Sequence, residues 1–298
     1  MRPFAEEQKT ETPALHSRSV TRRSLLMGAG LAVAGTTLYS CEFARHALQH
    51  IEVPVAVRNL PEAFQGFRIV QISDIHFDEY TEPSFFNHII QEVNALSADL
   101  VLITGDFITH GPPRHVPEQD IYQVAEALRG LTCPQRMGCL GNHDSAVGAD
   151  YIAGILRGRD TPVLVNQYVP IERSGQHIWI GGVADPATSR PNLGLAMPRN
   201  PDAPVILMAH APDYVDDVLR HPDGGKVDLV LSGHTHGGQV RLPGIGPLIL
   251  PPMGKKYAHG HYRFGSLQLY VNRGLGTVGV PIRFNCPPEI TTITLSRA

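Results

Sequence analysis

The sequence has little of several things that would mark a specialised class of protein. Its 298 residues carry a formal net charge of -3, so it lacks the broad basic field that holds nucleic acid through its phosphates. We therefore expect no specific nucleic-acid partner. It also lacks internal repeats and low-complexity linkers. With 42% hydrophobic and 18% charged residues, the chain can bury a sizeable core and falls in the ordinary globular class.

Cysteine is scarce as well, with four in the chain. Cys133, Cys139 and Cys286 are odd in number and lack the paired spacing of a metal site, which predicts buried thiols. A disulfide between Cys133 and Cys139 stays open for an oxidising compartment. The fourth, Cys41, ends "LYSC", which resembles a lipoprotein cleavage box except for its tyrosine, so lipidation of Cys41 also stays open.

The N-terminal stretch is the one place to look for a membrane segment. Arg22 and Arg23 precede an uncharged run over residues 24–40, which is short for a spanning helix and favours an export signal. The pattern Thr-Arg-Arg-Ser-Leu-Leu resembles the twin-arginine signal. We predict a signal segment over 1–41, read by the twin-arginine export machinery, and a single domain over 42–298. Such a signal predicts that the protein is in the periplasm or cell envelope, with membrane association through the N-terminus or Cys41. The alternatives to a twin-arginine signal are an ordinary secretory signal and an uncleaved anchor.

Short apolar runs alternate with helical patterns over the rest of the chain, as in α/β domains. Phe85, Ile89, Val93 and Leu96, for example, recur at helical spacing. The patterns predict strands at 67–73, 99–105, 136–141, 204–210, 227–233, 267–272 and 289–296, helices at 84–96, 120–130, 150–158 and 213–220, and a hairpin over 169–183. Residues 243–260, rich in Pro and Gly, predict a long irregular loop that is either functional or merely solvated.

Polar side chains follow five of the predicted strands at their C-terminal ends. They are Asp74 and His76, Asp106, Asn142, His210, and the pair His234 and His236. Each alone could be a turn or cap residue. Because α/β sheets gather ligands beyond the carboxyl ends of their strands, we expect all seven to meet in space.

Seven such groups are too many for one tetrahedral ion, whereas two ions that share a bridging carboxylate would use them all. Imidazole, carboxylate and amide without thiolate favour two divalent ions of Mn, Fe, Zn or Co over calcium. The positive charge left after the carboxylates suits an anionic phosphoryl group. We therefore expect hydrolysis of a phosphate ester by a hydroxide that bridges the metals.

The ordered motifs "DIH", "GDF", "GNHD", "AHAPD" and "GHTHGG" resemble the calcineurin-like metallophosphoesterase family. With the N-terminal segment, the closing stretch "YVNRGLGTVGVPIRFNCPPEITTITL" resembles its exported bacterial subgroup, labelled YaeI-like or YkuE-like. The resemblance implies an α/β fold, a four-layer α/β/β/α sandwich with a dinuclear metal site at the strand C-terminal ends. It assigns Asp74, His76 and His236 to one ion, Asn142, His210 and His234 to the other, and Asp106 to both. Gly237 and Gly238 would keep the backbone slim for close approach, or simply form a turn.

The same resemblance makes His143 the catalytic residue that contacts the phosphoryl group and protonates the leaving oxygen. Asp144 would orient that imidazole, or would instead cap the next turn. One departure stands out: many members read Gly-Asp-x-x-Asp where this chain reads Gly105-Asp106-Phe-Ile-Thr109. We expect Thr109 or His110 to replace the missing carboxylate by hydrogen bonding.

These residues predict a phosphoesterase for phosphodiesters or pyrophosphates in a small-molecule or envelope substrate. Monoesters usually need extra cationic clamps, and the metal motifs contain no arginine. Arg273 and Arg283 could supply a clamp, or could form surface salt bridges. The alternatives are a pyrophosphatase for nucleotide-linked lipids, which an apolar, basic-rimmed groove near 251–261 would favour, and a non-catalytic metal-binding envelope protein.

Overall fold

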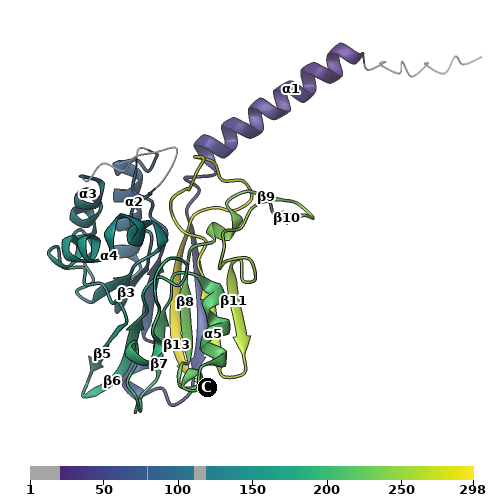
Figure 1. Cartoon of the computed structure of the whole chain (residues 1–298). Coiled ribbons are helices and arrows are strands. Elements are labelled where there is room, and N and C mark those ends of the chain that lie inside the picture. Colours follow the sequence, from purple (N-terminus) through teal and green to yellow (C-terminus); the bar gives the residue numbers. More distant parts are fainter. Residues whose placement is uncertain (1–20, 79, 111–118) are drawn as a thin grey trace, which may run out of the picture. The chain divides into compact units, whose positions relative to one another are not determined.

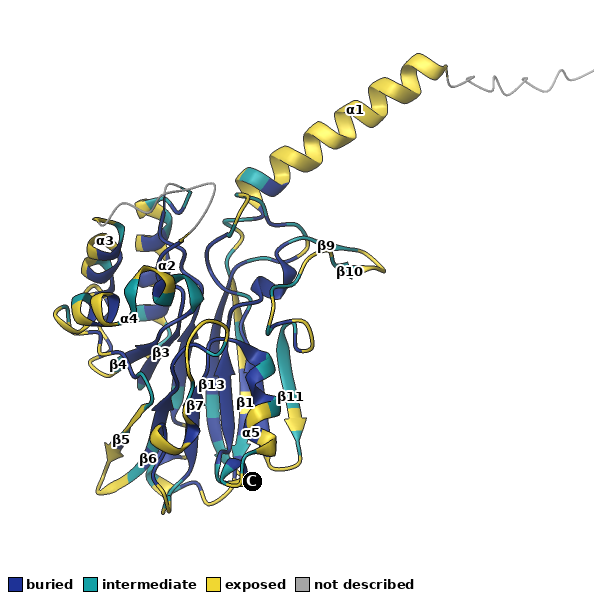
Figure 2. Cartoon of the chain, in the orientation of Figure 1, coloured by how far each residue is buried: buried dark blue, intermediate teal, exposed yellow. Residues whose placement is uncertain are grey.

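The N-terminal part of the chain is one long helix. The structure, a computed structural model, describes residues 21–78, 80–110 and 119–298, and the chain divides into two units between Leu38 and Tyr39 (Figure 1). Helix α1 (Arg22–Leu38) is exposed along its whole length (Figure 2). The run from Arg22 to Phe43 includes the π-helical turn η1 (Tyr39–Phe43) and has a mean hydropathy of 1.3. It is long and apolar enough to cross a membrane, a property that signal sequences near an N-terminus share.

The second unit is built on two sheets. The first sheet has the order β1 (Gln49–Val57), β13 (Glu289–Arg297), β2 (Arg68–Ile72), β3 (Leu100–Thr104) and β4 (Arg136–Cys139). Strands β2, β3 and β4 are parallel, with Ile69 opposite Leu100 and Val101 opposite Arg136. Their carboxyl ends therefore lie along one edge of the sheet.

The second sheet has the order β11 (Gly260–Phe264), β12 (Leu267–Val271), β8 (Leu229–Ser232), β7 (Val205–Met208), β6 (Gln176–Gly182) and β5 (Gln167–Arg173). Strands β6, β7, β8 and β12 are parallel. The predicted β5–β6 hairpin turns at Ser174 and Gly175, which both have the positive φ that such a turn requires.

The two sheets pack face to face around an apolar core. This core includes Ile69 and Leu102 from the first sheet and Ile180 and Leu231 from the second. Strands β3, β7 and β8 are buried at every position, which explains why they read as continuous apolar runs without alternation.

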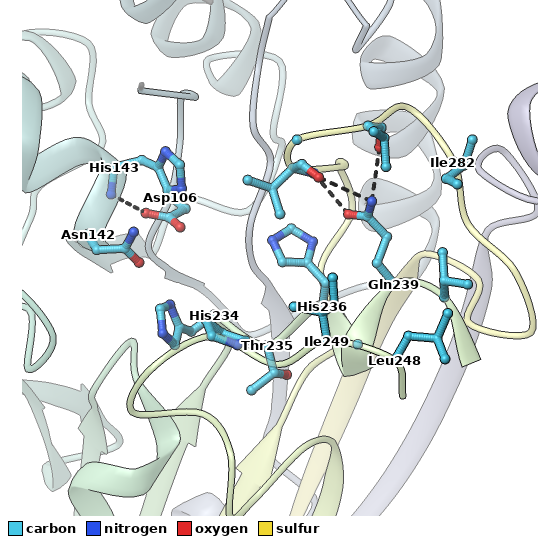
Figure 3. Close-up of a pocket in the computed structure, with 16 residues that line it drawn as sticks. Asp106, Asn142, His143, His234, Thr235, His236, Gln239, Leu248, Ile249 and Ile282 are labelled. Atoms are coloured by element: carbon cyan, nitrogen blue, oxygen red, sulfur yellow. Dashed lines mark hydrogen bonds between the residues drawn. The ribbon is translucent and has the colours of Figure 1, made fainter. Parts of the chain in front are cut away.

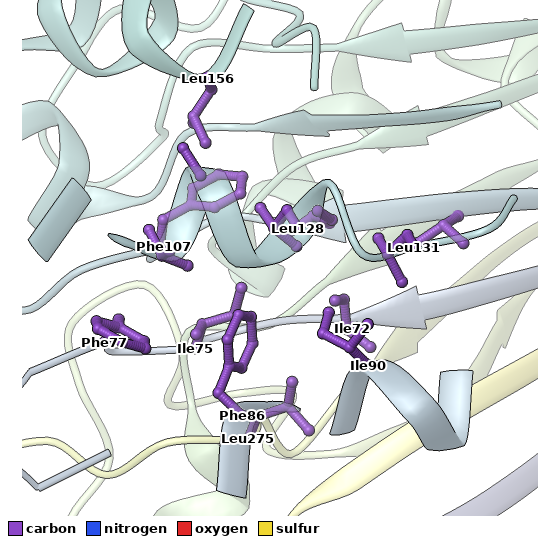
Figure 4. Packing of buried hydrophobic residues seen from close by; sticks show 14 of the residues in the cluster. Ile72, Ile75, Phe77, Phe86, Ile90, Phe107, Leu128, Leu131, Leu156 and Leu275 are labelled. Atoms are coloured by element: carbon purple, nitrogen blue, oxygen red, sulfur yellow. The ribbon is translucent and has the colours of Figure 1, made fainter. Parts of the chain in front are cut away.

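Helices cover the outer face of each sheet. α2 (Pro83–Ala95), α3 (Gln119–Leu128) and α4 (Asn142–Arg157) pack on the first sheet, where Phe86, Leu128 and Leu156 join Ile72 and Phe107 in one cluster (Figure 4). α5 (Val215–Arg220) packs on the second sheet through a separate cluster. The predicted four-layer α/β/β/α sandwich is therefore confirmed (Figure 1).

Several local features differ from the sequence-based expectation. β1 and β11 were not predicted, because both are edge strands with mixed burial and β1 contains the exposed Pro54. Helix α4 begins at Asn142 and not at residue 150, with a kink at Gly148. The loop at 243–260 contains half of a small hairpin, β9 (Arg241–Leu242) and β10 (Gly246–Pro247).

Short 3-10 helices and free thiols complete the unit. The 3-10 helices are η2 (Glu62–Phe64), η3 (Leu193–Leu195), η4 (Pro212–Tyr214), η5 (Gly224–Lys226) and η6 (His236–Gly238). All four cysteines are free, and Cys133, Cys139 and Cys286 are buried as predicted. The open alternative of a disulfide between Cys133 and Cys139 is not formed.

Candidate metal centre

The seven candidate ligands lie together at one end of the two sheets. Asp74 and His76 follow β2, Asp106 follows β3, Asn142 begins α4 just after β4, His210 follows β7, and His234 and His236 follow β8. Parallel strands explain this convergence, because their carboxyl ends share an edge. Figure 3 shows Asp106, Asn142, His234 and His236 facing one cavity from different elements.

Asp74, His76 and His236, which we call group one, are buried and hold their ligand atoms within 4.8 Å of one another. His76 Nε2 lies 3.1 Å from His236 Nε2, and Asp74 Oδ1 lies 3.4 Å from the same nitrogen. Burial lowers the pKa of His76 to about 3, so this imidazole is neutral at pH 7. Neutral nitrogens that face each other beside a carboxylate fit a bound cation.

Asp106, His210 and His234, which we call group two, also lie within 4.8 Å of one another. Asp106 Oδ2 is 3.1 Å from His210 Nε2 and 3.5 Å from His76 Nε2, so this single oxygen reaches both groups. Burial raises the pKa of Asp106, but the charge and hydrogen bond of His210 hold it well below its usual range. The Oδ1 of Asn142 is buried without a hydrogen-bond partner among the described residues, as expected of an oxygen kept for a ligand.

Hydrogen bonds at the outer ring nitrogens set which nitrogen of each histidine can bind metal. The Nδ1 of His210 donates to the carbonyl of Thr104 at 2.6 Å, and the Nε2 of His234 donates to the carbonyl of Pro252 at 2.7 Å. In the neutral form of each ring the opposite nitrogen then carries the lone pair. This is the usual arrangement behind metal-binding histidines. Burial lowers the pKa of His210, but the Asp106 carboxylate raises it well above its usual value, so this ring must lose the Nε2 proton that faces Asp106 before it can bind an ion.

His76 is held by a relay that runs through Thr109. The Thr109 hydroxyl donates to Asp78 Oδ2 at 2.7 Å and accepts from His76 Nδ1 at 3.2 Å. The lone pair of His76 therefore points to the group-one side. Thr109, expected to replace the missing family carboxylate by hydrogen bonding, connects His76 to a different carboxylate, that of Asp78.

His143 borders the same site. Its ring centroid lies 4.8 Å from that of His76, and its Nδ1 accepts from the backbone N–H of His110 at 2.8 Å. In the neutral ring the proton therefore sits on Nε2. His110, the other expected substitute, thus acts through its backbone.

The carboxylate of Asp144 has other partners. It accepts from the backbone N–H groups of Phe107, Ile108 and Gly141, at 2.9, 3.4 and 3.0 Å. Burial raises the pKa of this fully buried carboxyl to about 8. Among the described residues no hydrogen bond joins it to His143, so its contacts correspond to the capping alternative rather than the orienting one.

The backbone is strained where the ligands attach. Five of the seven candidates have positive φ, between 45° and 72°: Asp74, His76, Asp106, His234 and His236. Each such residue costs on the order of 1–3 kcal/mol, so the surrounding contacts must hold it. Close packing contributes, because a Cβ added at Gly141 would lie 2.1 Å from Asp106 Oδ1.

The structure decides between alternatives that the sequence left open for four nearby residues. The Arg283 guanidinium is fully buried and donates to backbone carbonyls including those of Gly276 and Cys286, so it does not supply a phosphate clamp to the cavity. Arg273 pairs with Glu289 and does not line the cavity. Gly237 and Gly238 do adopt positive φ, but their tight contacts are to Cys286, Arg273 and Pro247 rather than to the ligands.

A cavity of about 540 Å³ opens beside the site. Asp106, Asn142, His143, His234 and His236 are its polar lining, and Val240, Leu248, Ile249, Val278, Val280 and Ile282 form an apolar wall. Figure 3 shows Leu248 and Ile282 across the cavity from Asp106 and Asn142. Sequence reasoning missed this apolar wall. It also missed Gln239, whose side chain bonds the backbone of Val278 and Val280. The position of Gln239 directly after the glycine pair was the only available signal.

Comparison with known proteins decides the family. The profile described as calcineurin-like phosphoesterase matches residues 67–238. The chain belongs to this family. It is 34% identical to the uncharacterized metallophosphoesterase YkuE of Bacillus subtilis, over 93% of this chain and 98% of the relative. It is 29% identical to the phosphodiesterase YaeI of Escherichia coli, over 77% and 82%, and 27% identical to the UDP-2,3-diacylglucosamine pyrophosphatase LpxG of Chlamydia trachomatis, over 78% and 85%.

This calcineurin-like phosphoesterase is therefore a hydrolase of phosphoester bonds that uses two divalent metal ions. The buried donors of groups one and two fit such ions, because they offer imidazole and carboxylate atoms without thiolate.

Proposed function

We propose that group one holds one ion and that His210, His234 and Asn142 hold the other, with Asp106 between them. The position of Asp106 Oδ2, within 3.5 Å of His76 and 3.1 Å of His210, is the observation that carries this assignment. When bound, the two ions would polarise the phosphoryl oxygens and lower the pKa of a water molecule enough to make it a nucleophile near pH 7.

In this proposal His143 is the catalytic residue that contacts the leaving oxygen. The amide of His110 occupies Nδ1, so the N–H at Nε2 is the one available to the cavity. As the phosphorus–oxygen bond to the leaving group breaks, this N–H donates a hydrogen bond to the departing oxygen and stabilises the negative charge that develops there, and the departing oxygen takes its proton from water. Asp144 contributes by holding the backbone of Phe107 and Gly141 in place.

The preferred substrates are phosphodiesters or pyrophosphates. Among the described residues that line the cavity there is no lysine or arginine, so these residues offer a dianionic monoester no additional cation. The name of the relative YaeI agrees with diester cleavage. A second candidate is cleavage of a nucleotide-linked lipid: the apolar wall favours it, and LpxG is named for such a reaction. Release of UMP from UDP-2,3-diacylglucosamine would test it.

The proposal also includes export. Residues 1–41 would act as a twin-arginine-type signal that remains as a membrane anchor ahead of the domain at 42–298. Ser40 supports retention, because it is buried in the second unit and its carbonyl accepts from the backbone N–H of Arg283 at 3.1 Å. Cleavage directly before Cys41 would remove this contact. Fractionation of cells that express the full chain, with Arg22→Lys and Arg23→Lys together as the comparison, would test export.

The first experiment is metal analysis of the purified full chain together with rates for bis(4-nitrophenyl) phosphate and 4-nitrophenyl phosphate. We expect two metals per chain and a faster rate for the diester. His143→Ala should keep both metals and lose about 10²–10⁴-fold in turnover. His88→Ala, an exposed histidine of α2, is the matched control and should change neither. Loss of metal from His143→Ala would refute the assignment of His143, and two bound metals without any turnover would favour the non-catalytic alternative.

A further inference from the structure

The apolar wall of the cavity continues onto the protein surface. Leu248, Ile249 and Val280 line the cavity and are nevertheless 54%, 81% and 52% exposed. Exposed large apolar side chains that gather in one place indicate a binding surface, since scattered ones are ordinary. These three line the same cavity as four of the candidate metal ligands, and Figure 3 shows Leu248 and Ile249 in it.

The β9–β10 hairpin and the π-helical turn η1 carry further exposed apolar side chains. Ile245 lies at the turn of the β9–β10 hairpin and is 72% exposed, and Tyr39 and Phe43 of η1 are exposed as well. We call these side chains, together with Leu248, Ile249 and Val280, the apolar rim.

Backbone hydrogen bonds join the segments that carry the rim. Arg241 N–H donates to Phe284 at 2.9 Å, which ties the hairpin to the C-terminal segment. Arg283 N–H donates to Ser40 at 3.1 Å, which ties that segment to η1. The three segments that carry the rim are therefore tied together within the second unit.

The rim is also attached firmly to the metal centre. Gln239 follows His236 and the glycine pair, and its amide donates to the carbonyls of Val278 and Val280 at 3.2 and 2.9 Å (Figure 3). The N–H of Val278 donates back to the same side chain at 2.9 Å. A ligand that lies against Val280 is thereby held at a set distance from His236.

We propose that the apolar rim rests on a lipid surface and that the site hydrolyses phosphoesters of membrane lipids, with an aliphatic chain packed against the cavity wall. This inference rests on the proposed function. A water-soluble phosphodiester has no group that would cover the wall, whereas an aliphatic chain gains from leaving water. The chain itself supports a lipid as the ligand of the rim. Helix α1 together with η1 is long and apolar enough to span a membrane. Helix α1 ends at Leu38, immediately before the rim residue Tyr39.

The first test is kinetic. The full chain in mixed detergent micelles, loaded with Mn, is given the 4-nitrophenyl esters of methyl, octyl and hexadecyl phosphate. Each methylene that moves from water to the wall should raise kcat/KM about fourfold. Because the longer chains also enter the micelle, only part of this gain remains, and we expect the octyl ester to exceed the methyl ester by at least about tenfold. Ile249→Ser should lower this octyl-to-methyl ratio about tenfold. Leu195→Ser, at a leucine that is 59% exposed and lies outside the cavity, is the matched control and should leave the ratio unchanged.

The second test does not depend on turnover. The chain has one tryptophan, Trp179 on β6, so an added tryptophan is a usable reporter. Ile249→Trp and Leu195→Trp are each reconstituted in phosphatidylcholine vesicles with brominated acyl chains, which quench tryptophan fluorescence on contact. We expect quenching of the reporter in Ile249→Trp and none in Leu195→Trp.

The outcomes separate this inference from the proposed function. Quenching together with chain-length dependence would support the inference. An octyl-to-methyl ratio near one would overturn the lipid substrate, and a reporter in Ile249→Trp that is not quenched would overturn the placement of the rim at the membrane. If two metals are bound and none of the three esters is cleaved, the proposed function fails and the lipid substrate fails with it.

Discussion

Thr109→Val tests the relay that holds His76. The substitution keeps the side-chain volume but removes the hydroxyl that donates to Asp78 at 2.7 Å and accepts from His76 at 3.2 Å. Loss of a hydrogen bond to a buried charged group costs roughly 1.5–3 kcal/mol. We expect the free energy of unfolding of the metal-free protein to fall by about this amount in Thr109→Val. Loss of such support behind a metal-binding histidine costs about 10–100-fold in metal affinity.

The relay touches group one alone, so the two ions should respond differently. We expect Thr109→Val to weaken one Mn site about 10–100-fold, to leave the other site near its original affinity, and to regain activity at high Mn. The assay is Mn titration followed by elemental analysis, with urea unfolding in chelator for stability. Thr132→Val is the control: the Thr132 hydroxyl donates to Asn94 at 3.1 Å on the surface, away from the metals. Equal weakening of both sites, or no weakening of either, would refute the role given to the relay.

Two further predictions concern the same centre. Gly141 has a φ of -100°, which alanine adopts freely, so Gly141→Ala should act only through its added Cβ, which would lie 2.1 Å from Asp106 Oδ1. Because Asp106 reaches both groups, we expect both Mn sites to weaken together in the same titration. Burial raises the pKa of Asp74 to about 6 and lowers that of His76 to about 3, so without metal Asp74 is protonated below pH 6 and ionised above it, while His76 stays neutral. Affinity of the group-one ion should therefore fall up to about tenfold per pH unit below pH 6. Affinity measured from pH 7.5 to 5 checks this, and a midpoint unchanged in Asp74→Asn would contradict it.

Most of the strands and helices, the seven candidate ligands and the family could be read from the sequence by itself, whereas the edge strands β1 and β11 could not. The reason is local: strands buried on both faces read as continuous apolar runs, and polar residues that follow them at the carboxyl ends can reach one edge. Motifs such as "GNHD" and "GHTHGG" are short and contiguous, so they identify the family before any contact is known.

Only the tertiary structure decided how the ligands are supported and what surrounds them. The contact of Asp78 with His76 through Thr109 depends on where two loops meet, and no local pattern encodes that distance. The burial of Arg283, for which a phosphate clamp and a surface salt bridge were both open, follows from the path of the closing stretch around it. The apolar rim likewise joins three segments far apart in the chain, each of which reads alone as an ordinary loop or terminus.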